Sequence, residues 1–243
     1  MKLALLSDIH ANRQAFEACL AHAHGQGAQQ LALLGDLVGY GADPTAVLDQ
    51  VMALAAQGAW VIRGNHDDMA VQPPADNASV GSSTAQWTHD QLSPRHHAFL
   101  AGLPLTLQHE AVLLVHASAE APERWRYVHD SHAAAMSLDA VRQWPQVRYV
   151  FGGHVHLQTL YYRGSTGGLM MFTPTAGVAV PVPRHRHWLA TIGSVGQAMY
   201  ALFDSARAQL TFHRVDYDHH AAAAAIRRAG LPAHFADRLE TGR

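Results

Sequence analysis

The sequence predicts an α/β fold with two β-sheets, formed by residues 1–243 as a single domain. Three observations predict it. Hydrophobic residues make up 49% of the 243 residues and charged residues 15%, which is enough apolar material for a sizeable core. Up to residue 64, apolar runs alternate with helical segments, a pattern typical of parallel βαβ units with right-handed crossovers. From residue 157 onward, short apolar runs succeed one another, which indicates further strands.

Capping signals support the helices of the N-terminal alternation. Asn12 is a candidate N-cap for the first helix, and Asp43 places a capping carboxylate just ahead of Pro44, a favourable first-turn residue. Gly58 is expected to end the second helix. The expected order is strand 2–7, helix 12–25, strand 30–35, helix 44–57 and strand 59–64.

The remainder of the chain predicts a looser middle and a strand-rich second half. Pro73, Pro74 and Gly81 indicate a loop over 72–82, and helical segments follow around 84–101. Neither a linker nor an internal repeat is visible. The further elements expected are strands at 112–116 and 147–152 with a helix at 132–143 between them, strands at 157–163, 168–173, 188–193, 198–204 and 208–214, and a helix at 219–239.

Composition and charge exclude several classes of protein. Seventeen Lys and Arg against nineteen Asp and Glu give a net charge of −2, so there is no strong nucleic-acid signature and no attraction to an anionic membrane. The single cysteine, Cys19, excludes a disulfide framework and is expected inside a helix. The N-terminus lacks the pattern of an export signal, and no apolar stretch is long enough to cross a bilayer, so we expect a cytoplasmic protein. Patterning predicts no oligomeric state.

Metal-ligating residue types occur just after the expected strands. The carboxyl ends of parallel strands are where α/β proteins build their ligand sites. Histidine is abundant, with nineteen in the chain, so position counts for more than number. The residues that follow strands are Asp8 and His10, Asp36, Asn65 and His66, His116, and His154 and His156.

This set makes chemical sense as a site for two divalent metal ions. One ion would be held by Asp8, His10 and His156, a second by Asn65, His116 and His154, and Asp36 would bridge them. Imidazole with carboxylate and amide oxygen suits Mn, Fe, Zn or Ni. Two divalent ions and two carboxylates leave a positive surplus that suits a phosphate ester, and two such ions can clamp both oxygens of an in-line displacement.

The motifs resemble the calcineurin-like metallophosphoesterase superfamily. They are, in order, Asp8-x-His10, Gly35-Asp36, Gly64-Asn65-His66-Asp67, His116 and Gly153-His154-x-His156. Further stretches are similar to the small bacterial YfcE-like, diadenosine-tetraphosphatase-related branch, namely GDLVGYGADP at 35–44, QWTHDQLSP at 86–94 and GSVGQ at 193–197. The resemblance implies a four-layer α/β/β/α sandwich of two mixed sheets flanked by helices. It also implies hydrolysis of phosphodiesters or phosphomonoesters by attack of a metal-bridging hydroxide.

Four residues beside the ligand set are candidates for catalysis or substrate binding. His66 is the candidate general acid, since an imidazole with a pKa near 6.5 can protonate a leaving oxygen near neutrality, with Asp67 orienting its ring. Asn12 and Tyr40 are candidate substrate-binding residues. The alternatives are helix capping for Asn12 and packing for Tyr40.

One departure from the superfamily bears on the substrate. Its protein phosphatases carry GDxxDRG, whereas here Gly39, Tyr40 and Gly41 follow Asp36-Leu37-Val38. The Asp–Arg pair that would meet a phosphate is missing, which disfavours protein phosphatase activity. Phosphodiesters are slightly favoured, while nucleotide, phosphoprotein and sugar phosphate esters all stay open.

Two other classes of function compete with a phosphoesterase. The first is a non-catalytic module that binds a phosphate ligand or a protein on the same scaffold. Such a module would be expected to have lost a bridging or acid residue, and none is missing. The second is a zinc amidohydrolase, which would place an HxH motif on the first strand where this chain has Asp8-x-His10.

Overall fold

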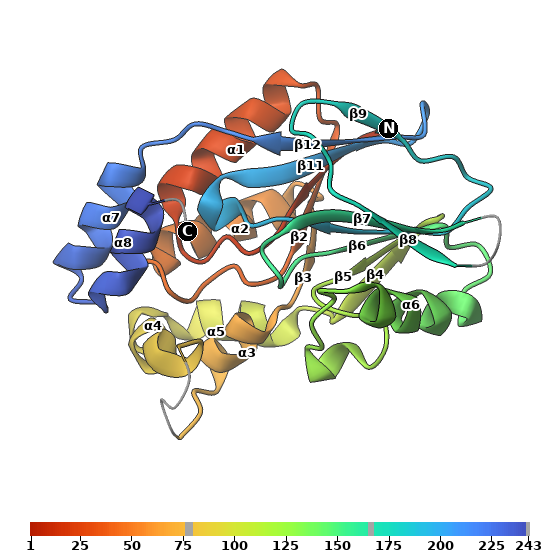
Figure 1. The fold of residues 1–243 in the computed structure, drawn as a ribbon. Helices are drawn as coiled ribbons and strands as arrows, with labels where there is room; N and C mark the ends of the chain where they lie inside the picture. Colours follow the sequence, from red (N-terminus) through yellow and green to blue (C-terminus); the bar gives the residue numbers. More distant parts are fainter. Residues whose placement is uncertain (76–79, 165–167, 242–243) are drawn as a thin grey trace.

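Two six-stranded mixed sheets form the centre of the fold (Figure 1). The computed structural model describes residues 1–75, 80–164 and 168–241. The first sheet has the order β3 (Trp60–Ile62), β2 (Gln30–Leu34), β1 (Lys2–Leu6), β11 (Met199–Asp204), β12 (Gln209–Arg214) and β9 (Ala179–Pro181). The second has the order β4 (Thr106–His109), β5 (Val112–Val115), β6 (Tyr149–Gly152), β10 (Trp188–Ile192), β7 (Gln158–Arg163) and β8 (Leu169–Phe172).

Helices cover the outer faces of both sheets, which confirms the predicted four layers (Figure 1). Along β1, Leu3 and Leu5 point into the core between the sheets, while Ala4 and Leu6 point to the helices on the outer face. This alternation is the two-residue period of a strand buried on both faces. The helices are α1 (Arg13–Gly25), α2 (Pro44–Ala56), α3 (Asn65–Val71), α4 (Ala85–Gln91), α5 (Pro94–Gly102), α6 (Ser131–Ala140), α7 (His219–Arg228) and α8 (Ala233–Thr241).

Parallel pairing brings the carboxyl ends of several strands to one edge of each sheet. β1 pairs in parallel with β2, and β2 with β3, as the N-terminal alternation predicts. In the second sheet β5, β6 and β10 are parallel neighbours. The loops after β1, β2, β3, β5 and β6 carry the candidate metal ligands.

The structure corrects the predicted elements in two places, at the expected helix 219–239 and at three short elements. The helix expected at 219–239 is two helices, because Gly230 with φ of 70° ends α7 and Pro232 precedes α8. The helical segments expected around 84–101 are confirmed as α4 and α5, and the Ser93 side chain caps the new start at Pro94. Short α3, β4 and β9 were not predicted. The loop expected at 72–82 is described apart from residues 76–79, which lie outside the described residues.

Two predicted details at α1 are confirmed. The side chain of Asn12 accepts a hydrogen bond from Ala15 N at 3.1 Å and so caps the helix. Cys19 is buried within the same helix. In the part of the chain that the structure describes, no helix has both the length and the apolar character needed to cross a membrane.

A buried histidine on β12 predicts that the protein loses stability in acid. Burial, together with the smaller effect of neighbouring His22, lowers the pKa of His213 to about 4, and the His213 ring stacks on Tyr200 with centroids 4.8 Å apart. Because the pKa is lower in the folded than in the unfolded chain, the unfolded chain binds the extra proton between pH 6.5 and about 4. Stability from this residue is therefore present above pH 6.5 and is lost as the pH falls, by about 3 kcal/mol at most.

Urea unfolding at pH 7 and pH 4.5 checks this expectation. The difference in unfolding free energy between the wild type and His213→Leu should narrow or reverse in acid. His24→Leu, at an exposed position of α1, is the matched control and should follow the wild type at both pH values. A pH-independent difference between wild type and His213→Leu would contradict the expectation.

Candidate metal centre

The loops after the strands hold the candidate ligands in an unusual backbone conformation. Five of the seven residues proposed as ligands have φ between 51° and 67°, namely Asp8, His10, Asp36, His154 and His156. A non-glycine residue in this left-handed region is strained, at a cost of order 1 kcal/mol each, and such strain clusters at functional sites. Backbone hydrogen bonds from His10 N to Asp36 O and from Asp8 N to Gly35 O, both 3.0 Å, tie the first two loops together.

One group of side chains gathers around Asp8. His156 Nε2 lies 3.2 Å from Asp8 Oδ1 and 3.0 Å from His10 Nε2, and His10 Nε2 lies 3.8 Å from the same carboxylate oxygen. This is the trio that the sequence predicted for one ion, and its atoms are close enough together to share a cation.

A second group gathers around His116. Its Nε2 lies 3.1 Å from Asn65 Oδ1, 3.2 Å from His154 Nδ1 and 3.3 Å from Asp36 Oδ2. The structure thus brings Asn65, His116 and His154 together, as expected for a second ion. Asn65 is the first residue of α3, so its side chain reaches the site from a helix and not from a left-handed turn.

Asp36 stands between the two groups. Its Oδ1 accepts the backbone N–H of His66 at 2.8 Å. Its Oδ2 lies 3.3 Å from His116 Nε2 in the second group and 3.9 Å from His10 Nε2 in the first. A single oxygen therefore faces both groups, which is the geometry required of a bridging carboxylate.

Hydrogen bonds orient two of the imidazoles for metal binding. His116 Nδ1 donates to Leu34 O at 2.8 Å, and His10 Nδ1 donates to Val38 O at 3.3 Å. Since a carbonyl only accepts, each Nδ1 carries the proton and each Nε2 lone pair faces the cluster. Several acceptor atoms thus converge within hydrogen-bond distance of one another, an arrangement that a cation stabilises. The residues present fit two divalent ions.

The charges of the cluster are tightly coupled. Burial opposes ionisation of Asp8, but His156 outweighs it and lowers the pKa of that carboxyl to about 2. Burial likewise opposes protonation of His116, yet the Asp36 carboxylate raises the pKa of the His116 imidazole to about 10. Without a metal, the Asp36 carboxylate therefore favours a second proton, on His116 Nε2, and a metal binding there would replace that proton and take up the Nε2 lone pair.

Two glycines allow the loops to approach the carboxylates. A Cβ atom added at Gly153 would overlap the Asp8 carboxylate and the Ser7 hydroxyl. A Cβ atom at Gly64 would overlap the Asp36 carboxylate and its backbone nitrogen. Glycine is therefore required at both motif positions for reasons of space.

His66 and Asp67 lie on α3 beside the cluster. The His66 ring is 4.9 Å from the His10 ring and 4.4 Å from the Tyr40 ring. Burial lowers the pKa of His66 below its usual value, with the neighbouring carboxylates of Asp36 and Asp8 acting in the opposite direction. The imidazole is therefore a stronger acid than the unperturbed value assumed from the sequence, with a smaller protonated fraction at neutral pH.

The structure gives Asp67 a different contact from the one predicted. Its carboxylate accepts backbone N–H groups of Leu37 and Gly64, both at 2.9 Å, and of Val38 at 3.3 Å. No hydrogen bond among the described residues joins it to the His66 ring. Asp67 positions the loop that carries Asp36. Burial, reinforced by the charge of Asp36, raises the pKa of Asp67 to about 7.

The opening above the cluster, here called the mouth of the site, is the cavity lined by Asp36, Asn65, His66, His154 and His156 together with the aromatic rings of Tyr40 and Tyr127 and with Arg238 of α8. Tyr127 stacks on His154 with ring centroids 4.0 Å apart, and Tyr40 lines two cavities, one beside His10 and one beside His66. Asn12 lines one of these cavities, but its amide also donates to Gly196 O at 2.9 Å, so it has a structural role as well as a place at the site.

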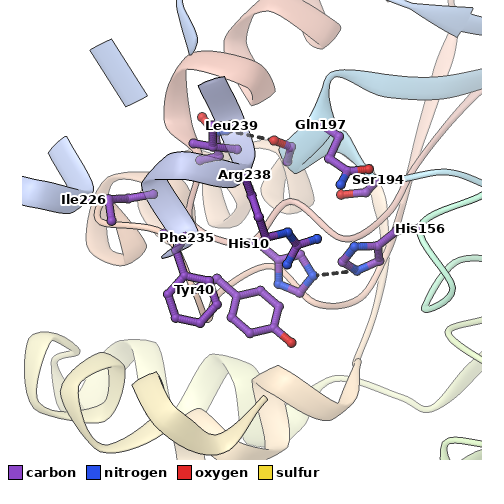
Figure 2. A pocket seen from close by; sticks show the side chains of 12 residues that line it. His10, Tyr40, His156, Ser194, Gln197, Ile226, Phe235, Arg238 and Leu239 are labelled. Carbon is purple, nitrogen blue, oxygen red and sulfur yellow. Dashed lines mark hydrogen bonds between the residues drawn. The ribbon is translucent and has the colours of Figure 1, made fainter. Parts of the chain in front are cut away.

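Phe235 and Arg238 of α8 are two further residues at the site that no sequence motif predicts. Both lie at the cavity beside His10 (Figure 2). They are far from the motifs along the chain and belong to no pattern that predicts a site. Only the docking of α8 brings them to the cluster.

Comparison with known proteins identifies the family. The chain shares 29% identity and a TM-score of 0.87 with the crystal structure of a metallophosphoesterase from Sphaerobacter thermophilus, over all of both chains. It is 27% identical to the uncharacterized protein MJ0912 of Methanocaldococcus jannaschii, over 99% of this chain and 98% of the relative. Protein PH1004 of Pyrococcus horikoshii has the same fold, with a TM-score of 0.75 at 18% identity over 98% of this chain and 97% of that one.

The family model confirms the resemblance that the motifs predicted. Residues 1–216 match the calcineurin-like phosphoesterase superfamily domain, a segment that contains every candidate metal ligand. With this match and the fold described above, the chain belongs to the calcineurin-like phosphoesterase superfamily.

Proposed function

We propose that this protein is a binuclear metal-dependent phosphoesterase that hydrolyses small phosphomonoesters or phosphodiesters. The observation that carries the proposal is the position of Asp36 Oδ2 between two groups of ligand atoms. Asp8, His10 and His156 would hold one ion, and Asn65, His116 and His154 would hold the other. Mn, Fe, Zn and Ni all suit this mixed set of nitrogen and oxygen ligands. A cytoplasmic location also stays a prediction.

The charge of the site favours a phosphate ester. Two divalent ions bring four positive charges, and Asp8 and Asp36 return two negative ones, which leaves a net positive site. When bound, such ions supply a water-derived nucleophile at neutral pH and neutralise charge on the phosphate. The chain's own task is to hold the ions at one spacing, through Asp36, and to keep the ligand lone pairs directed inward, through Leu34 O and Val38 O.

His66 completes the proposed machinery as the general acid. Its backbone N–H is fixed by Asp36 Oδ1, and its ring lines the mouth of the site, where the leaving group of a substrate would lie. A proton on this imidazole would pass to the departing oxygen as the bond to phosphorus breaks. Tyr40 and Asn12 would contact the remainder of the substrate.

Hydrolysis of bis-p-nitrophenyl phosphate and p-nitrophenyl phosphate tests the function. We expect no turnover from metal-stripped protein and turnover of at least one ester after reloading with Mn²⁺, with two metal ions bound per chain. A p-nitroanilide substrate serves as the control for amide hydrolysis. Turnover of the anilide alone would favour a zinc amidohydrolase, and two bound metals with no turnover of any substrate would favour a non-catalytic module.

A further inference from the structure

The motifs around the proposed metal centre include no positively charged side chain that would bind the phosphate group of a substrate. In the stretch after Asp36, where the superfamily's protein phosphatases carry an Asp–Arg pair, this chain has Gly39, Tyr40 and Gly41. A phosphate ester has non-bridging oxygens that two metal ions do not fully satisfy, and arginine is the side chain that binds such oxygens in pairs. A phosphate ester would therefore bind more tightly if another part of the chain placed an arginine at the site.

Arg238 of α8 occupies that place. It lines the cavity that contains His10 and Tyr40, and it also lines the mouth that contains His66 and His156. Figure 2 shows its side chain extending from α8 toward the His10 and His156 rings. Of the arginines and lysines in residues 1–75, 80–164 and 168–241, it alone lines either cavity. The mouth has a volume of about 390 Å³, within the range of sites for small ligands.

Packing on the site itself fixes the face of α8 that carries Arg238. Phe235 is 3% exposed, and its ring lies 4.8 Å from the Tyr40 ring, which in turn lies 4.4 Å from the His66 ring. Residues three apart in a helix lie on one face, so a helix that seats Phe235 on Tyr40 also directs Arg238 to the metal centre.

A second arginine, on α7, binds two carboxylates of α8. Arg227 of α7 donates to both carboxylate oxygens of Glu240, at 2.8 and 2.7 Å, and to Asp237 Oδ1 at 3.0 Å. These ion pairs join α7 to α8 and so help to hold α8 in the position where Arg238 lines the site.

We propose that Arg238 is the phosphate-binding, specificity-determining residue of this protein, acting on the non-bridging oxygens of the ester. The inference rests on the proposed phosphoesterase function and extends it to the substrate's charge. A monoester dianion gains more from an added cation than a diester monoanion does, so Arg238 favours substrates that end in a phosphate group. The residue comes from a helix outside the 1–216 segment that matches the family model.

Kinetics of Arg238→Gln and Arg238→Lys with Mn²⁺-loaded protein test the inference. For Arg238→Gln we expect KM for p-nitrophenyl phosphate to rise about 10- to 100-fold, because the variant loses a pair of charge-assisted hydrogen bonds to the phosphate. The value of kcat should change little. KM for the diester should rise less than about 5-fold, and bound metal should stay unchanged. Arg238→Lys keeps the charge but not the paired donors, and should recover part of the loss. Arg228→Gln, exposed on α7, is the matched control and should behave as wild type.

A binding measurement separates failure of this inference from failure of the proposed function. Inorganic phosphate should raise the melting temperature of Mn²⁺-loaded wild type and Arg228→Gln, and raise that of Arg238→Gln much less. If wild type turns over esters while KM and phosphate protection are the same in Arg238→Gln, Arg238 does not bind phosphate. If wild type turns over no ester but Arg238→Gln alone loses phosphate protection, the inference holds and the catalytic function fails.

Discussion

Asp36→Asn should abolish metal-dependent turnover and weaken the binding of both ions together. The Oδ2 atom of Asp36 faces both ligand groups, so an amide nitrogen there removes the proposed bridge and one negative charge. Loss of an outer-sphere partner already costs about 10- to 100-fold in metal affinity, so a bridging ligand should cost at least about 100-fold. Metal content after gel filtration and kcat/KM with bis-p-nitrophenyl phosphate measure both effects.

The fold should survive this substitution, which makes the result interpretable. In the wild type, Asp36 Oδ1 accepts a hydrogen bond from the backbone N–H of His66, and the side-chain oxygen of Asn can accept the same hydrogen bond. The matched control is Asp90→Asn, an exposed carboxylate on α4 whose contact is with Gln86. Full metal occupancy and full turnover in Asp36→Asn would show that the two ligand groups are not bridged by this residue.

His66→Asn should reduce turnover in a way that depends on the leaving group and should leave the metals bound. A general acid contributes about 10²- to 10⁴-fold when the leaving oxygen needs a proton. Phenyl phosphate has such a leaving group, so the variant should lose about that factor in kcat. p-Nitrophenolate departs readily without a proton, so kcat for p-nitrophenyl phosphate should fall only about 10-fold or less.

The ratio of the two rates is the informative quantity. A structural disturbance at α3 would slow both substrates alike, whereas loss of the acid slows only the poor leaving group. His24→Asn, on the exposed part of α1, is the matched control and should change neither rate. Equal losses on both substrates would assign His66 a positioning role in place of acid catalysis.

The strands of the fold and the candidate ligands were predictable from the sequence because their signals are local. Short apolar runs, such as the four apolar residues that follow Gln30 in β2, form buried strands, and the ligands follow such runs within a few positions. The capping of α1 by Asn12 has a local signal as well. The break at Gly230 also has a local signal, but the high helix propensity on either side concealed it.

Contacts between distant residues had no such signal. Asp67 accepts hydrogen bonds from the backbone of Leu37 and Val38, about thirty residues away in the chain. The sequence suggested the neighbouring His66 ring as its partner, because His66 is adjacent to Asp67 in the chain. The pairing of β9 with β12 at the edge of the first sheet also depends on the rest of the sheet. β9 has only three residues, which is too few for an alternation of apolar and polar residues to predict a strand.

The sequence by itself determined the two-sheet α/β architecture, the family and the residue types able to hold two ions. It did so because strand periodicity and ligand spacing are properties of short segments. Only the tertiary structure decided that Asp36 Oδ2 faces both ligand groups and that Arg238 reaches the same site. Those facts depend on how β1, β2 and the helix pair α7–α8 pack, and this packing brings together side chains that are more than two hundred residues apart in the chain.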